Sequence, residues 1–151
     1  MEFKFLKRPI VTDNLKKYVQ EKVESFKNGN NSISTLWFVL NEEEKIIANC
    51  IDADLNWIKN KGVFNKPQNK WGGMREYESN FFGSLDKIDA FSVVGQLILF
   101  RLRPRIFTNE CIAFALSRLY SYFEFYDLCK ILLDFAAELR EKEKEKVKKD
   151  E

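Results

Sequence analysis

The sequence contains no histidine among its 151 residues. This absence excludes an imidazole general base, a Ser-His-Asp or Cys-His catalytic arrangement and a zinc site with histidine ligands. Glycine and proline are scarce, with 6 and 3 residues, whereas turn-rich all-β architectures usually need more of both. No apolar run approaches the roughly 18 residues of a membrane span, and the first residues lack a signal-peptide stretch. The sequence therefore predicts a soluble, cytoplasmic protein without the common hydrolase mechanisms.

Cysteine is also rare, and the three residues present are Cys50, Cys111 and Cys129. Their odd number and wide spacing fit neither a disulfide framework nor a paired metal or redox motif. Cys111 and Cys129 lie on apolar helix faces, where burial raises the pKa of a thiol and makes it unreactive. We expect three reduced, mostly buried thiols.

Apolar and charged residues are abundant, at 45% and 32% of the chain, and the net charge is only +2. Aromatic residues make up 15%, and 14 of them are phenylalanine, which predicts a dense core for one domain of ordinary size. We assign residues 1–139 to a single helical domain. Residues 140–151 alternate acidic and basic side chains around a single Val147, which predicts an exposed, frayed helical tail.

The apolar spacing in the first half of the chain is helical. Asp13 is the candidate N-cap of a helix that ends at Gly29, and its apolar residues recur on one face. Asn41 and Glu44 have the spacing of a capping box at the start of a second helix, which ends near Gly62. The apolar residues of the first helix are Leu15, Tyr18, Val19, Val23 and Phe26.

The second half predicts three more helices, and the whole chain an all-α domain of five or six. A strongly apolar helix over residues 85–103, capped by Ser84 and ended by Pro104, is expected to be central. Thr108 caps the next helix. The helices packed around the central one would start near Asn14, Glu42, Asn109 and Asp127. The alternative fold is α+β, with a hairpin at about residues 33–51, because residues 33–40 have strand propensity.

Basic residues concentrate between residues 55 and 75, a stretch without any acid. Trp57, Phe64 and Trp71 accompany them, and phosphates and unpaired bases bind to such combinations of cations and stacking surfaces. A second basic group follows residue 100 at a helix exit. The alternative interpretation is a solvated loop and a helix-terminal charge cluster. The candidate nucleic-acid contacts are Lys59, Lys61, Lys66, Lys70, Trp71, Arg75, Arg101, Arg103 and Arg105.

An aromatic cluster lies between the last two predicted helices, from residue 120 to residue 126. Its simplest interpretation is a corner where two helices pack together. The alternative is a surface that binds a protein partner. The candidate partner-binding residues are Tyr120, Tyr122, Phe125 and Tyr126.

Paired carboxylates are the only route to an enzyme. Asp52 and Asp54 flank Ala53, and Glu76 and Glu78 flank Tyr77, so either pair is a candidate for Mg²⁺ binding. In a helix, however, residues two apart point about 200° from each other, which separates Asp52 from Asp54. We therefore expect solvated acids on helix surfaces, and we predict no metal site and no cofactor.

These observations favour a small, non-catalytic binding or assembly subunit. We expect a protein partner or self-association, with RNA or DNA as a further candidate partner and no membrane. The first alternative is a homo-oligomeric structural protein without nucleic-acid contact. The second is a carboxylate-dependent metal enzyme. No motif in the chain identifies a family.

Overall fold

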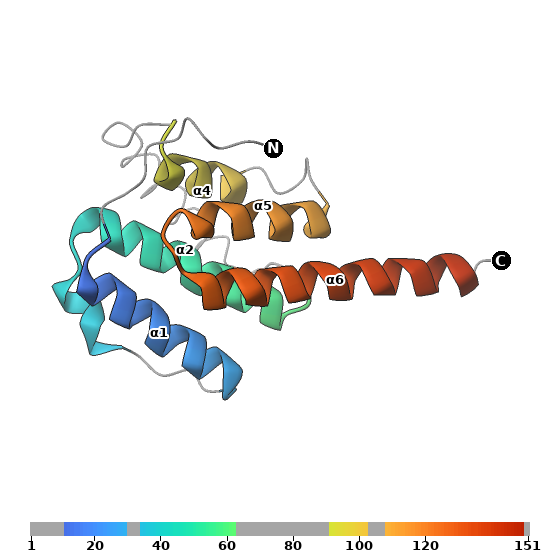
Figure 1. Cartoon of the computed structure of the whole chain (residues 1–151), viewed down its shortest axis with the longest axis horizontal. Helices are drawn as coiled ribbons and strands as arrows, with labels where there is room; N and C mark the ends of the chain where they lie inside the picture. Colours follow the sequence, from blue (N-terminus) through green and yellow to red (C-terminus); the bar gives the residue numbers. More distant parts are fainter. Residues whose placement is uncertain (1–10, 30–33, 63–90, 103–107, 150–151) are drawn as a thin grey trace.

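The computed structural model of the protein describes residues 11–29, 34–62, 91–102 and 108–149, and the side chains of residues 99–102 and 146–149 lie outside this description. Within these ranges the chain forms helices and no strand (Figure 1). The all-α prediction is confirmed. The elements are α1 (Asp13–Lys27), the 3-10 helix η1 (Thr35–Val39), α2 (Glu42–Lys59), α4 (Val93–Leu102), α5 (Asn109–Ser121) and α6 (Tyr126–Lys149).

The first two long helices begin at side-chain caps that also bind each other. The N-cap of α1 is Thr12 rather than Asp13, which lies in the first turn. The predicted capping box of α2 is confirmed: the Glu44 N–H donates to Asn41 Oδ1 at 2.8 Å, and the Asn41 N–H donates to Glu44 Oε1 at 3.1 Å. The Thr12 hydroxyl donates to the same Glu44 carboxylate. One buried acid therefore fixes the start of α2 against the start of α1.

Residues 35–39, between α1 and α2, form the 3-10 helix η1, so the alternative fold with a hairpin at about residues 33–51 is not observed in the described residues. Ser34 caps η1, since its Oγ accepts the Leu36 N–H at 3.2 Å, and its hydroxyl donates to Glu21 of α1. A side chain that binds the backbone two residues ahead favours a turn over an extended strand. The remainder of the hairpin segment forms the first half of α2.

The end of α2 has the hydrogen bonds of a Schellman motif. The Gly62 N–H donates to the Trp57 carbonyl at 2.9 Å, and the Lys61 N–H donates to the Ile58 carbonyl at 3.0 Å. Lys61 and Gly62 have positive φ angles of 57° and 88°, a region that favours glycine. A Cβ on Gly62 would lie 2.5 Å from Asn109 Nδ2. The missing side chain thus lets the end of α2 approach the start of α5.

The described part of the predicted helix over residues 85–103 begins only at Val93. Residues 91 and 92 are not helical, and Ser92 Oγ accepts the Gly95 N–H at 3.0 Å, which caps α4 at its start. Nor is α4 central among the described helices. That position belongs to α2, which packs against α1 and α4 and also contacts α5 and α6 through Asp54 and Trp57.

The last two helices form an antiparallel hairpin and lie side by side (Figure 1). Thr108 caps α5 as predicted, accepting the Cys111 N–H at 3.2 Å. A second Schellman motif ends α5, with Glu124 at a φ of 63°. Helix α6 continues through residue 149, past the start of α5, and residues 140–145 are exposed. None of the described helices is both long enough and apolar enough to span a membrane.

Candidate binding groove

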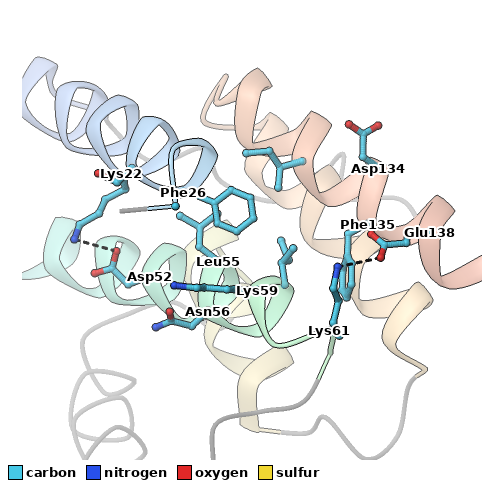
Figure 2. A pocket seen from close by; sticks show the side chains of 14 residues that line it. Lys22, Phe26, Asp52, Leu55, Asn56, Lys59, Lys61, Asp134, Phe135 and Glu138 are labelled. Carbon is cyan, nitrogen blue, oxygen red and sulfur yellow. Dashed lines mark hydrogen bonds and ion pairs between the residues drawn. The ribbon is translucent and has the colours of Figure 1, made fainter. Parts of the chain in front are cut away.

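A groove of about 740 Å³ lies between α1 and α6, with α2 as its floor (Figure 2). It opens where α1 and α6 diverge over the second half of α2. Residues far apart in the sequence therefore line one concave surface. The lining residues are Lys22, Ser25, Phe26, Gly29, Asp52, Leu55, Asn56, Ile58, Lys59, Lys61, Ile131, Asp134, Phe135 and Glu138.

The centre of the groove is apolar. Leu55 and Ile58 are buried floor residues, whereas Phe26 of α1 and Ile131 of α6 are only half-buried. Phe135 is fixed from below by the Trp57 indole, whose ring centroid lies 5.1 Å away at an interplanar angle of 85°. This edge-to-face contact holds α6 on α2. The floor of the groove is therefore part of the hydrophobic core. The two half-buried wall residues present apolar surface to the solvent.

Three lysines and three acids surround the apolar centre. Lys61 and Glu138 pair at 3.1 Å at one end of the groove, and Glu138 also lies 3.5 Å from Lys142. The hydrogen bond from Lys61 lowers the pKa of Glu138. Lys59, at the end of the α2 floor, and Asp134, on the α6 wall, are exposed and make no ion pair within the described part of the chain. The groove therefore offers one unpaired cation and one unpaired anion.

Asp52 closes the groove on the α1 side. Its carboxylate accepts the Tyr18 hydroxyl at 2.7 Å and lies 3.9 Å from Lys22 Nζ. Burial raises the pKa of Asp52, although the Tyr18 hydrogen bond and the Lys22 charge act in the opposite direction. Burial likewise raises the pKa of Tyr18. This end of the groove is a fixed hydrogen-bonded wall rather than a solvated acid.

Asp52 and Asp54 do point in different directions. Asp52 is partly exposed, whereas Asp54 is not the solvated acid that the sequence suggested. Asp54 is buried and accepts the Tyr120 hydroxyl of α5 at 2.5 Å. Asp52 binds Tyr18 of α1 on the other side of α2. The structure shows no cluster of metal ligands among the described residues. Glu76 and Glu78 lie outside the described residues.

Two of the nine candidate nucleic-acid contacts can be placed. Lys59 and Lys61 lie on the groove, and Arg101 lies near the end of α4 with its side chain undescribed. Trp57, which was expected to offer a stacking surface, is only 2% exposed, because it packs between α2 and α6. The other candidates, Lys66, Lys70, Trp71, Arg75, Arg103 and Arg105, lie outside the described residues, as does Phe64.

The aromatic cluster is mostly interior. Tyr120 and Phe125 are buried, and Phe125 stacks on Phe123 with ring centroids 5.3 Å apart. Tyr122 is half-buried, whereas Tyr126 is 67% exposed. The cluster therefore forms the corner between α5 and α6. Of the four candidate partner-binding residues, Tyr126 is the one that offers a largely free side chain.

The cysteine prediction is partly wrong. Cys50 and Cys129 are buried, and burial raises the pKa of Cys129 to about 11. Cys111, however, is exposed. Its neighbours Ile112, Ala115 and Leu116 are buried, so Cys111 lies at the edge of the buried side of α5 rather than within it. The chain thus presents one accessible thiol among the described residues.

Sequence reasoning missed the groove itself. Phe26 and Ile131 were read as core residues because they continue the apolar faces of their helices, and Asp134 had no signal at all. A groove depends on the angle at which α1 and α6 cross α2, and that angle is not encoded in the spacing within one helix. Comparisons with protein-family models, with curated proteins and with solved structures found no match to this chain.

Proposed function

We propose that the protein is a non-catalytic binding subunit that holds an amphipathic helix of a protein partner in the groove between α1, α2 and α6. The observation that carries this proposal is an apolar floor flanked by an unpaired lysine and an unpaired aspartate, Lys59 and Asp134. Grooves of this kind recognise the apolar face of a helix and read its flanking charges.

The size of the groove fits this occupant. A cylinder about 10 Å across with the groove's volume of about 740 Å³ is about 9 Å long, or roughly six residues of helix at 1.5 Å rise per residue. Six residues place two apolar side chains, three or four apart, over the floor. Phe26 and Ile131 would contact them from opposite walls.

The charges select the partner's chemistry. With three lysines and three acids on its rim, the groove has no excess of cations to attract a polyanion. A helix with an acid opposite Lys59 and a base opposite Asp134 complements it. Asp52 and Asp54 bind tyrosines of different helices, so this carboxylate pair does not share a metal position.

The test uses a charge swap in the groove. The variant Lys59→Glu/Asp134→Lys keeps the net charge and reverses the two unpaired groups, and Lys17→Glu/Glu24→Lys is a matched swap on the exposed side of α1. Each protein serves as bait in extract of the native cells, with and without nuclease. We expect wild type and the control swap to capture the same partner protein after nuclease treatment. The groove swap should no longer capture it.

Nucleic-acid binding is the second candidate, because residues 55–75 carry five cations and no acid. It predicts that capture depends on intact nucleic acid, and that log affinity for RNA or DNA falls linearly with log salt. Lys59→Ala would then shallow the salt slope by about one unit. If no captured protein is lost when the groove charges are swapped, the proposed function is rejected, whichever result the salt titration gives.

A further inference from the structure

The hairpin of α5 and α6 has a second surface, which the groove does not use. Two contacts fix the register of the antiparallel pair: the Cys129 thiol donates to the Ser117 carbonyl at 3.1 Å, and Arg140 lies 2.7 Å from Glu110. Residue numbers that face each other across the hairpin therefore sum to about 246 to 250. This register pairs Cys111 with Ala137, Phe114 with Leu133, and Arg118 with Lys130.

These six residues share one face. Glu110 of α5 and Cys129 of α6 each face the other helix, so they serve as reference positions. At about 100° of rotation around the helix axis per residue, the three residues of α5 lie about 40 to 100° from Glu110. The three residues of α6 lie at the same angles from Cys129. Because the helices are antiparallel, equal rotations from the facing positions lead to the same side of the hairpin. All six are exposed. We call this surface the hairpin face: Cys111, Phe114 and Arg118 of α5, and Lys130, Leu133 and Ala137 of α6.

The centre of the hairpin face is apolar, and the other described residues leave it exposed. Phe114 is 50% exposed and Leu133 is 44% exposed, although both lie in the middle of their helices. Asp134 and Glu138 line the groove, and Figure 2 shows Glu138 directed toward Lys61, whereas the Asp134 carboxylate is directed away from the other labelled residues. At about 100° per residue, Asp134 lies one step around α6 from Leu133, and Glu138 one step from Ala137. An apolar centre with a basic border indicates a protein contact rather than a solvated surface.

We propose that the hairpin face binds a second copy of this chain, with the two hairpins antiparallel about a two-fold axis near Phe114 and Leu133. The argument from size is that each large side chain then meets a small one. Phe114 faces Cys111 of the other copy, and Leu133 faces Ala137. Such alternation of large and small residues is what lets facing helices interdigitate.

Charge selects the same orientation. In the antiparallel pair Lys130 faces Glu141 of the other copy, and Tyr126 faces Lys144. Both groups lie on the exposed extension of α6, where Glu141 and Lys144 form an i, i+3 ion pair at 3.6 Å within one copy. The contacts across the two-fold axis would replace this exposed pair, which contributes little to stability. In the other two-fold arrangement, α5 of one copy lies over α6 of the other. Arg118 then faces Lys130 of the other copy, and the two positive charges repel each other. The charged extension of α6 thereby acquires a function as the border of a dimer interface.

Sedimentation equilibrium over a range of concentrations tests the interface. We expect a dimer whose dissociation constant rises at least tenfold in Leu133→Glu. Phe38→Glu is the matched control, because Phe38 is a 77% exposed aromatic residue of η1, outside the hairpin face. Circular dichroism establishes that each variant is folded.

A charge reversal tests the orientation independently of apolar contacts. Lys130→Glu and Glu141→Lys should each weaken the dimer, and the combined variant should restore wild-type affinity. Cys111 should also be cross-linked between copies by a short bis-maleimide, since Cys50 and Cys129 are buried. A protein that is monomeric at every concentration, or a dimer insensitive to Leu133→Glu and to the charge reversal, overturns the proposal. Neither result bears on the groove, which is tested by different residues.

Discussion

The two flanks of α2 use the same chemistry in different surroundings. On one flank the Tyr18 hydroxyl of α1 binds half-buried Asp52, with Lys22 3.9 Å away. On the other, the Tyr120 hydroxyl of α5 binds Asp54 in the core. The aspartates are two residues apart, so about 200° of rotation sends one to each side. The α5 flank is closed core, whereas the α1 flank is where the groove opens.

Trp57→Ala should have the largest effect on stability of the variants compared, because it truncates a side chain buried on the closed side of α2. Trp57 is 2% exposed and packs on Phe135. Truncation of a buried aromatic side chain destabilises a protein by about 3–5 kcal/mol. The free energy of unfolding, measured by urea denaturation, should fall by that amount.

The matched control is Trp37→Ala on the α1 flank. Trp37 is half-buried and lies 6.2 Å from Tyr18 between ring centroids. Its truncation leaves a space that water can enter, so the loss should be distinctly smaller. Equal losses for the two tryptophans would contradict the distinction between a closed flank and an open one.

Local capping was predictable, whereas burial and helix packing were not. The Asn41–Glu44 capping box and the Thr108 cap follow from residues three apart, and both are confirmed. Trp57 lies in a helix that the sequence predicts to end near Gly62, but the lysines that follow it suggested a stacking surface. In the structure its indole is buried and packs on Phe135 of α6. The sequence predicts that a residue is apolar, but its depth depends on which helix crosses above it.

Tyr120→Phe and Tyr18→Phe compare the two tyrosine–aspartate bonds directly. Removal of the donor leaves the buried Asp54 carboxyl without this hydrogen bond, which costs about 1–3 kcal/mol, and we expect this loss for Tyr120→Phe. Asp52 is half-buried and keeps Lys22 and water as partners, so Tyr18→Phe should reduce the free energy of unfolding by about 1 kcal/mol or less. Urea denaturation of both variants beside wild type measures the two values.

The reverse order of the two losses would show that the α1 flank is the tighter one. A control for general effects of removing a tyrosine hydroxyl is Tyr126→Phe, because Tyr126 is largely exposed. It should leave the free energy of unfolding unchanged.

The position of the groove illustrates how a site can escape sequence analysis. Asp134 and Lys59 are 75 residues apart in number, and neither belongs to a motif. They line the same groove because Trp57 packs on Phe135 and docks α6 on α2, and because α2 ends in a Schellman motif at Lys61. The first cause is a contact between helices and the second is a rare backbone angle. Periodicity within one helix reveals neither.

The pH dependence of stability should also differ between the two ends of the groove. Because burial raises the pKa of Asp52, the folded protein holds this proton to a higher pH than the unfolded chain. Relative to Asp52→Asn, the free energy of unfolding of wild type should therefore fall as the pH rises from about 4 toward neutral. Urea denaturation of both proteins across this range measures the difference.

Glu138 at the other end should give the opposite sign. Its pKa is lowered by Lys61, so its contribution to stability is present above the ordinary pKa of glutamate and is lost as the pH falls through the folded value. Relative to Glu138→Gln, wild type should lose stability on acidification below about pH 4. A rise with acid at Glu138, or a fall with acid at Asp52, would contradict the assigned causes.

The smallest effects should come from the two non-glycine residues that end α2 and α5. Lys61 and Glu124 hold positive φ angles of 57° and 63°, a conformation that disfavours residues with a Cβ by about 1–2 kcal/mol, while glycine adds about 0.4–1 kcal/mol of unfolded-state entropy. Glu124→Gly should therefore raise the free energy of unfolding by up to about 1 kcal/mol.

Lys61→Gly relieves the same strain but removes the ion pair with Glu138, so its gain in the free energy of unfolding should be smaller at low salt. The two variants should become equal at high salt, where exposed pairs are screened. Urea denaturation at both ionic strengths measures the gap, and a gap that persists in salt would mean that Lys61 contributes through packing rather than through charge.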